Sequence, residues 1–315
     1  MGNEIVQMAD GAHLVATVDL VSERLGVAPG FLYLLSNHVE EHYSVHRVPK
    51  GDGRFRVIEA PDDKLKEVQR GILDHILPRR VHRIAMAFEP HRGILDNARA
   101  HCMRNVVLML DLKDFFPSLR FPRVCEYFLF VGYPMSLAVL LAKLCTLGGH
   151  LPQGAPTSPH LANLLMRDFD RRIFDYCRRR RLYVTRYADD IAISGDMSDE
   201  RIAETVAFCR RTLREMGLRI NYRKLRVLRK GRRQTVTGLV VNEKPNVPRV
   251  MRRTLRQRMH YLKRYGLVGF DPVDMKNARS LLGSVEFVCQ VRPDDVEFRQ
   301  YAEWLKRLLG EMANS

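Results

Sequence analysis

The sequence predicts an α+β fold in which an antiparallel sheet packs on helices. Three observations lead to this prediction. An apolar run at 106–110 that ends at Asp111 is typical of a buried central strand. The tetrapeptide Tyr187-Ala188-Asp189-Asp190 lies between two short, β-branched segments, which is the pattern of a hairpin with a tight turn. Residues 202–216 then show helical spacing, so strands and helices alternate along the chain.

The first part of the chain contains the signals of helices and one hairpin. Residues 1–50 carry helical spacing that is interrupted by a breaker at 26–30, so we expect an N-terminal helical cap. Residues 51–61 begin with a Gly-Asp-Gly turn and then alternate, which suggests a hairpin. Residues 64–77 form an amphipathic pattern that ends before Pro78, and this pattern predicts a helix.

The second half continues with a loop, a helix and two basic regions. A loop at 151–159 is rich in Gly and Pro, and it precedes a predicted helix at 159–175. Residues 219–233 contain eight Lys or Arg and no acid, with apolar residues at every second or third position, which indicates strand-like structure with a basic face. After a Pro-containing break at 245–248, the chain is predicted to be helical and carries many arginines.

The composition indicates a globular protein with a polyanionic partner. The 315 residues are 46% hydrophobic and 28% charged, and 52 Lys and Arg against 36 Asp and Glu leave a net charge of +16. The most apolar run, at 137–142, is far too short to span a membrane, and there is no signal peptide. The six Cys form no C-x-x-C pair. We therefore expect a cytoplasmic protein with reduced cysteines and no membrane partner.

Three carboxylates form the candidate catalytic and metal site: Asp111, Asp189 and Asp190. Adjacent carboxylates raise each other's pKa unless a counter-charge is present, so a bound divalent cation would explain the pair. Hard oxygen ligands favour Mg²⁺ or Mn²⁺. The alternatives are a surface turn at Asp189-Asp190 and an Asp111 that caps the following helix.

Five motifs in order resemble those of a known enzyme family. Asp111-Leu112-Lys113-Asp114-Phe115-Phe116, the loop 151–159 and Tyr187-Ala188-Asp189-Asp190 resemble the palm motifs of reverse transcriptases. Asn97-Ala98-Arg99-Ala100-His101 and Val236-Thr237-Gly238 resemble the N-A-x-x-H and V-T-G elements of bacterial retron reverse transcriptases. The resemblance covers about half of the chain. It implies a right-hand polymerase with an N-terminal helical cap (1–50), fingers with the N-A-x-x-H insertion (51–105), a palm with interspersed fingers elements (106–244) and a helical thumb (245–315).

The resemblance also assigns roles to residues at motif positions. Asp111 and Asp189 would bridge two Mg²⁺ ions, Asp190 would complete the set, and the backbone carbonyl of Leu112 would be a further ligand. The ring of Phe116 would exclude the 2′-hydroxyl of a ribonucleotide, although Phe116 could instead be a core residue. The other implied nucleotide-binding residues are Arg56, Gln153, Gly154 and Lys224. A solvated hairpin face for Arg56 and a plain turn for Gln153 and Gly154 are the alternatives.

RNA binding is expected in the basic regions and in the two retron-type elements. A basic helix next to a catalytic palm suits a thumb that follows a duplex backbone. Asn97 and His101 could equally hold a loop by hydrogen bonds. The candidate RNA-binding residues are Asn97, His101, Arg229, Lys230, Arg232, Arg233, Val236, Thr237, Gly238, Arg252 and Arg256.

The function implied by the resemblance is that of an RNA-directed DNA polymerase of retron type. Such an enzyme would use dNTPs to copy a cognate structured non-coding RNA, starting at a guanosine 2′-hydroxyl, into a branched RNA–DNA called msDNA. An effector protein and a role in anti-phage defence are further implications. Because the sequence ends at Ser315 without room for an RNase H domain, a separate host RNase H is expected to remove the template. The alternatives are a group II intron-like or diversity-generating reverse transcriptase, and a non-catalytic RNA-binding scaffold with a polymerase-like fold.

Overall fold

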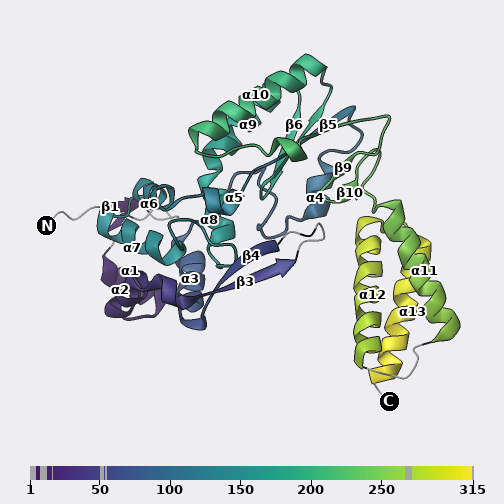
Figure 1. Ribbon diagram of the computed structural model, residues 1–315, viewed down its shortest axis with the longest axis horizontal. Coiled ribbons are helices and arrows are strands. Elements are labelled where there is room, and N and C mark those ends of the chain that lie inside the picture. Colours follow the sequence, from purple (N-terminus) through teal and green to yellow (C-terminus); the bar gives the residue numbers. More distant parts are fainter. Residues whose placement is uncertain are drawn as a thin grey trace.

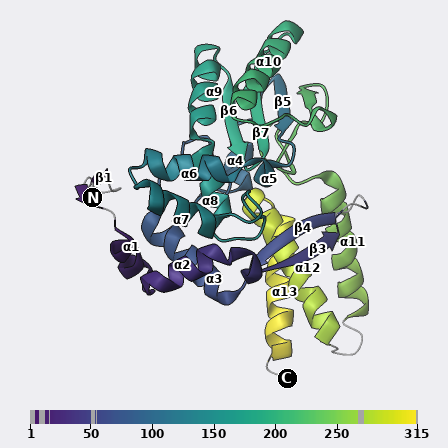
Figure 2. The same cartoon turned by 60° about the vertical axis from the view of Figure 1, so that its left-hand side comes forward.

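The protein has the predicted α+β fold. The computed structural model describes residues 5–7, 13–15, 17–49, 53, 55–266 and 272–313. Figure 1 shows a sheet covered by helices, a long hairpin below it, and three long C-terminal helices that stand to one side. In the view of Figure 2 the hairpin β3–β4 lies in front of these C-terminal helices.

A four-stranded antiparallel sheet with the order β6-β7-β5-β8 lies at the centre. Every residue of β5 is buried, as expected for an apolar strand with a neighbour on each side. The hairpin formed by β6 and β7 turns at Ala188 and Asp189, which confirms the predicted strand–turn–strand unit. The strands are β5 (Val106–Asp111), β6 (Tyr183–Tyr187), β7 (Asp190–Gly195) and β8 (Arg226–Arg229).

The two faces of β5 belong to different hydrophobic cores, because successive side chains of a strand point to opposite faces. Leu108 and Leu110 lie in a core with apolar residues of α9 (Arg167–Arg179) and α10 (Asp199–Glu215). Val107 and Met109 belong to a second core, which contains Ala98 of α4 (Ile94–Arg99) and apolar residues of the C-terminal helices. Strand β5, which ends at Asp111, therefore packs against both hydrophobic cores.

Two further helices of the first core were predicted from the sequence, and the structure differs from one of these predictions. The helix predicted at 159–175 is two helices, which meet at Met166. The helix predicted at 64–77 is confirmed and ends in a π-helical turn at Ile72–Ile76. The other helices here are α3 (Asp63–Gly71), α5 (Phe115–Ser118), α6 (Phe121–Phe130), α7 (Met135–Cys145) and α8 (Ser158–Leu165).

The N-terminal helical cap predicted at 1–50 is helical in its middle, but strands lie at both ends. Leu14 lies in a strand, and among the described residues up to 49 the helical ones fall between Val18 and His42. Tyr43–Pro49 forms β3, because its backbone pairs with that of β4 (Phe55–Pro61) in one antiparallel hairpin. The expected boundary at residue 50 therefore falls inside this hairpin. The other elements are β1 (Ile5–Gln7), β2 (His13–Val15), α1 (Val18–Leu25), α2 (Pro29–Asn37) and a 3₁₀ turn at Val39–His42.

Part of the predicted hairpin turn lies outside the described residues. This applies to Gly51, Asp52 and Arg54, while the flanking strands of the hairpin are described. The predicted hairpin is therefore present. Its first strand, β3, lies before residue 51, where the predicted hairpin began.

The basic segment 219–233 is only partly a strand. It contains a 3₁₀ turn at Tyr222–Lys224 and then β8. A second small hairpin follows, made of β9 (Thr235–Val236) and β10 (Leu239–Val240). Its turn residues Thr237 and Gly238 both have positive φ values, 44° and 83°, as two-residue hairpin loops require.

The C-terminal part is helical, as predicted. Its helices are packed together through buried apolar residues such as Leu255, Val285 and Phe298. Of all helices in the described ranges, none is both long and apolar enough to cross a membrane. The cysteines are free, and those at 125, 145, 177 and 209 are buried. The helices are α11 (Arg249–Tyr265), α12 (Pro272–Val291) and α13 (Val296–Ala313).

Candidate active site

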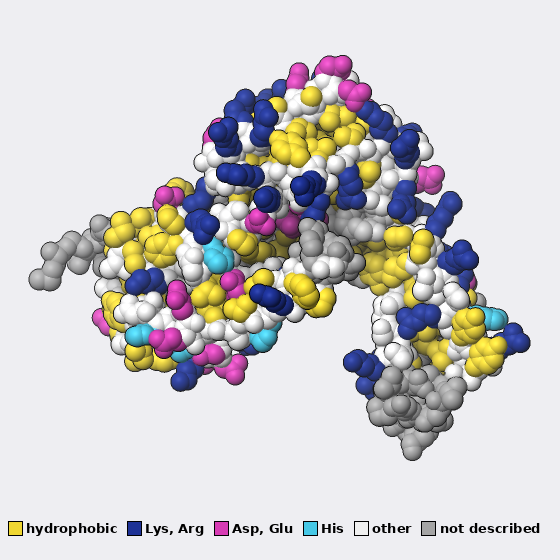
Figure 3. All heavy atoms as spheres, viewed as in Figure 1, with side chains coloured by type: hydrophobic (Ala, Val, Ile, Leu, Met, Phe, Trp, Pro, Cys, Tyr) yellow, Lys and Arg dark blue, Asp and Glu magenta, His cyan; other side chains and the backbone are white. Residues whose placement is uncertain are grey.

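The three predicted carboxylates are brought together at one end of the central sheet. Asp111 is the last residue of β5 and is the register partner of Asp190, the first residue of β7. Asp189 lies in the turn between β6 and β7, and its backbone carbonyl accepts a hydrogen bond of 3.0 Å from the amide of Leu112. Strand pairing therefore places carboxylates from two distant segments side by side. Figure 3 shows acidic side chains in the hollow between the upper and lower parts of the molecule, with Lys and Arg above them.

Asp111 is held by two side chains from the basic segment. The Lys224 ammonium lies 2.7 Å from Oδ1 of Asp111, and the Asn221 amide donates to Oδ2 at 3.0 Å. The backbone amide of Asn221 also donates to the carbonyl of Asp111 at 2.8 Å. The motif analysis missed Asn221, because a single Asn among basic residues carries no distinguishing sequence signal.

The site carries more negative charge than its positive neighbours compensate. Burial raises the pKa of Asp189 above its usual range, and the charge of Asp111 raises it further. Burial, followed by the charges of Asp189 and Asp111, raises the pKa of Asp190 to about 6. A bound cation would stabilise the ionised form of both groups.

The donor chemistry of these residues fits a divalent cation. Carboxylate oxygens are the ligands that hard divalent ions prefer, and the raised pKa values indicate an unmet need for positive charge. Within the described ranges, however, no three His, Cys, Asp or Glu side chains converge closely enough to form a metal cage. The positive charge next to Asp111 comes from the Lys224 ammonium, 2.7 Å from Oδ1. The role predicted for the carbonyl of Leu112 stays a prediction.

The turn that carries Asp189 is fixed by a buried ion pair. The Arg186 guanidinium makes two hydrogen bonds, of 2.7 and 2.6 Å, to the carboxylate of Asp170 in α9, and both side chains are fully buried. The same guanidinium donates to the carbonyl of Ala188 at 3.1 Å. Ala188 has φ 55°, an uncommon value for a residue other than glycine. Arg186 therefore positions the turn that carries Asp189, a role that its place in a short strand did not reveal.

The loop containing Gln153 and Gly154 is joined to the hairpin β3–β4. The carbonyl of Gln153 accepts from the amide of Glu59 at 3.0 Å, and the Glu59 carboxylate accepts from the amide of Gln153 at 3.3 Å. Gly154 has φ 150°, and a Cβ atom there would lie 2.4 Å from the carbonyl oxygen of Glu59. Only glycine allows this close approach. Glu59 was not among the predicted site residues.

Phe116 packs among aromatic rings, and Arg56 lies close enough to Asp189 to act on its charge. Phe116 is half-buried and packs against Phe115 and Phe88, with ring centroids 5.4 and 6.4 Å away. Arg56 is exposed on β4, and its charge lowers the pKa of Asp189. Their predicted roles toward a nucleotide stay predictions.

The two retron-type elements contact each other inside the protein. The Asn97 amide donates to the hydroxyl of Thr237 at 3.3 Å, and the Thr185 hydroxyl donates to the Asn97 side-chain carbonyl. The His101 ring lies 2.7 Å from the hydroxyls of Thr185 and Ser194. Burial lowers the pKa of His101 to about 3, so the ring is neutral at physiological pH.

This burial corrects three of the RNA-binding predictions. Asn97 is 2% exposed, and His101 and Val236 are fully buried, so none of them can contact RNA in this conformation. They instead connect β6, β7 and the β9–β10 hairpin. At the hairpin turn Gly238 is exposed, and Thr237 is half-buried with its hydroxyl directed inward.

The predicted basic residues fall into two groups. Lys230, Arg232 and Arg233 are exposed to solvent. Arg229 forms an ion pair with Asp199. Arg252 is ion-paired with Asp295 at 2.5 Å and Arg256 with Glu297 at 2.7 Å, so both hold α11 against the start of α13. These two arginines therefore have a structural role that the charge pattern alone did not indicate.

Comparison of the sequence with known proteins identifies its family. Residues 48–262 match the family described as reverse transcriptase (RNA-dependent DNA polymerase). The chain is 37% identical to the retron Mx65 reverse transcriptase of Myxococcus xanthus over 305 residues, covering 89% of this chain and 70% of the relative. It is 35% identical to the retron Ec86 reverse transcriptase of Escherichia coli, covering 73% of each chain. Among solved structures, a telomerase from Candida albicans shares 11% identity at a TM-score of 0.48, covering 86% of this chain and 60% of the other.

Proposed function

The chain belongs to the retron reverse transcriptases, which are RNA-directed DNA polymerases with a right-hand fold, and from this premise we propose that it copies a structured non-coding RNA into DNA. The observation that carries the proposal is the register pairing of Asp111 with Asp190, next to Asp189. A scaffold that only binds RNA has no need for three mutually repelling carboxylates, of which Asp111 is buried and Asp189 and Asp190 are half-buried.

The family uses divalent metal ions, and we propose two Mg²⁺ ions here, with Mn²⁺ as a substitute. Asp111 and Asp189 would hold both ions, with Asp190 and the carbonyl of Leu112 completing the set. Such ions lower the pKa of an attacking hydroxyl and stabilise the charge of the leaving pyrophosphate.

The remaining residues of the site would select and orient the nucleotide. Arg56 and Lys224 carry positive charge next to the carboxylates and suit the triphosphate of a dNTP. The half-buried ring of Phe116 would exclude a 2′-hydroxyl. Gln153 and Gly154, which are joined to the hairpin through Glu59, would lie against the nucleotide and the template.

The product and partners follow from the retron type. We propose that the enzyme starts from a guanosine 2′-hydroxyl of its cognate RNA and produces branched msDNA. Removal of the template would depend on a separate host RNase H. An effector protein and an anti-phage role complete the proposal.

The polymerase subdomains would divide the chain as follows. The hairpin β3–β4 and the following helices would form the fingers, and the four-stranded sheet with α9 and α10 would form the palm. The helices α11 to α13 would form the thumb. Their separation from the sheet in Figure 1 supports this division.

Extension of a primed RNA template with dNTPs and Mg²⁺ tests the proposed activity. Asp189→Asn should abolish DNA synthesis and keep the fold, because it removes one charge and almost no volume. Asp168→Asn, at an exposed position of α9, is the matched control and should retain activity. Substantial Mg²⁺-dependent synthesis by Asp189→Asn would show that the site is wrongly assigned. Sequencing the nucleic acid that copurifies with the wild-type protein would identify the cognate RNA.

A further inference from the structure

A second cluster of cations surrounds a cavity at the opposite end of the sheet. This cavity has a volume of about 770 Å³, and its lining includes Asn105, Ser198, Arg201, Arg229 and Lys230. Strand β5 begins beside the cavity and ends at the carboxylate site. At about 3.3 Å per residue, its length places the two sites on the order of 17 Å apart. The cavity is therefore distinct from the catalytic site.

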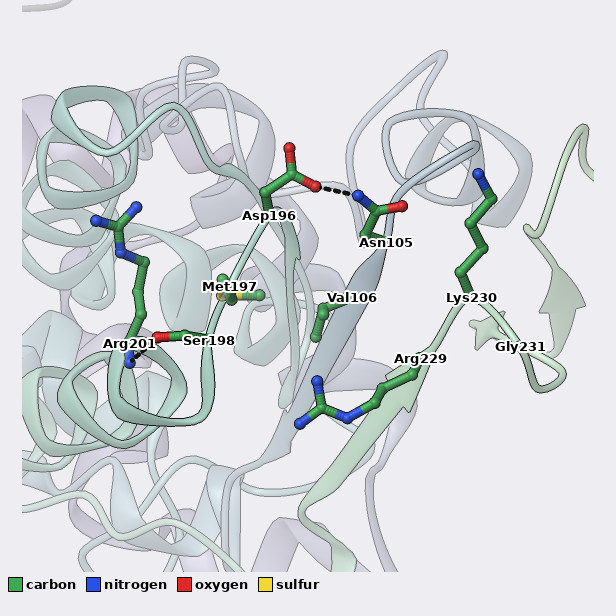
Figure 4. Close-up of a pocket in the computed structure, with 9 residues that line it drawn as sticks. All are labelled: Asn105, Val106, Asp196, Met197, Ser198, Arg201, Arg229, Lys230 and Gly231. Atoms are coloured by element: carbon green, nitrogen blue, oxygen red, sulfur yellow. Dashed lines mark hydrogen bonds between the residues drawn. The ribbon is translucent and has the colours of Figure 1, made fainter.

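The cations of the cavity differ in how far they are neutralised. Figure 4 shows Arg201 and Lys230 on opposite sides, with the hydrogen-bonded pair Asn105 and Asp196 between them. Arg229 is paired with Asp199 at the start of α10. Arg201 and Lys230 are exposed, and neither has an ion-pair partner in the part of the chain that the structure describes. Two cations are thus available to an anionic ligand.

The loop that carries Lys230 is held in place by two amide side chains. Gln234 is fully buried, and its amide donates to the carbonyls of Arg104 and Leu228, both at 3.0 Å. The Asn242 amide donates to the carbonyl of Arg232 at 2.8 Å, and its side-chain oxygen accepts from the amide of Gln234 at 2.9 Å. The backbone amide of Lys230 donates to the carbonyl of Asn105 at 2.8 Å. The loop is therefore preorganised, which reduces the entropy lost when a ligand binds.

We propose that this cavity binds phosphate groups in the backbone of folded RNA, outside the strand that is being copied. This inference rests on the proposed function and adds a location to it. Arg201 and Lys230 lie on different elements and on opposite sides of the Asn105–Asp196 pair. The Asp196 carboxylate would repel an anion placed between the two cations, so they suit separate phosphates of one extended backbone better than a single small anion. Gln234 and Asn242 act as positioning residues for the loop.

Binding of a folded RNA hairpin across a salt series tests the proposal. The test variant is Arg201→Ala/Lys230→Ala, and the charge-matched control is Arg179→Ala/Arg210→Ala, at two exposed positions of α9 and α10. Each lost phosphate contact should lower the slope of log affinity against log salt by about 0.7 to 0.9. The affinity lost between 50 and 200 mM salt should therefore be about ten-fold smaller for the test variant than for wild type, whereas the control should match wild type.

Hydrogen exchange of the wild-type protein provides an independent measurement. Addition of the RNA hairpin should slow exchange in 196–201 and 229–235. If both double variants shift the slope equally, or if these segments stay unprotected, the cavity does not bind RNA. Protection by millimolar GTP without RNA would overturn the proposal in favour of a nucleotide site. DNA synthesis by the wild-type protein is measured separately, so failure of the polymerase assignment would be distinguishable from failure of this site.

Discussion

The side-chain amide of Asn97 donates a hydrogen bond to the hydroxyl of Thr237 at 3.3 Å, and it thereby joins two segments that are 140 residues apart. The Thr237 hydroxyl in turn donates to the carbonyl of Ile94 at 3.2 Å. Through Thr185 and His101 the same chain of hydrogen bonds reaches Ser194 in β7, the strand that begins with Asp190. The turn at Thr237 and Gly238 and the hairpin that carries Asp189 thus share one polar network.

Removing the hydroxyl of Thr237 should destabilise the protein. Thr237→Val keeps the shape and the β-branched side chain but leaves the Asn97 amide without this partner, which should cost about 1–3 kcal/mol of unfolding free energy. Thr237→Ser keeps the hydroxyl and should cost less than about 1 kcal/mol. Urea denaturation of both variants provides the comparison. Equal losses would show that the hydrogen bond is not what stabilises this turn.

Adding a side chain at Gly154 should separate its loop from the hairpin β3–β4. Gly154→Ala would introduce a clash with the carbonyl of Glu59 and a backbone strain of about 1–3 kcal/mol. We expect lower stability and a higher KM for dNTPs. Gly30→Ala is the control, because a Cβ there meets nothing within 4 Å, and Ala in a helix should stabilise by up to about 1 kcal/mol. A Gly154→Ala enzyme with wild-type stability and KM would contradict the structure at this contact.

Shortening the side chain of Phe116 should relax sugar selection. Phe116→Val opens space where the 2′-hydroxyl of a ribonucleotide would lie, and we expect the preference for dNTP over rNTP in kcat/KM to fall by about 10- to 200-fold. The matched control is Phe130→Val, since Phe130 is 80% exposed in α6. If Phe116→Val kept the wild-type preference for dNTP over rNTP, Phe116 would have only a packing role.

Protonation of His101 should make stability depend on pH. Burial, with a smaller effect from Arg104, lowers the pKa of His101 from 6.5 to about 3 in the folded protein. The unfolded state therefore binds more protons between these values, and stability is lost as the pH falls below 6.5. At about 1.36 kcal/mol per pH unit, the loss from this group at pH 5 is about 2 kcal/mol.

A His101→Gln variant separates this effect from the titration of other groups. It should be less stable than wild type at pH 7, and the difference should shrink by about 2 kcal/mol at pH 5. Urea unfolding at both pH values gives the two differences. A pH-independent difference would mean that His101 does not stay neutral in the folded state.

The amino-acid sequence by itself determined the strand that ends at Asp111, the hairpin that carries Asp189, and the C-terminal helices. These features arise from local causes, because apolar periodicity and turn chemistry act over a few neighbouring residues. The same local rules misassigned 43–49, where a strand continues directly from a helical region and becomes recognisable only through its partner β4.

Only the tertiary structure decided which distant polar groups meet. Arg186 with Asp170, Asn221 with Asp111, and Asn97 with Thr237 are pairs of residues whose separate sequence contexts give no sign of each other. A buried polar group must find a hydrogen-bond partner, but the partner is selected by how the strands and helices pack. For this reason the carboxylates of the site were predictable from sequence, whereas the residues that hold them in position were not.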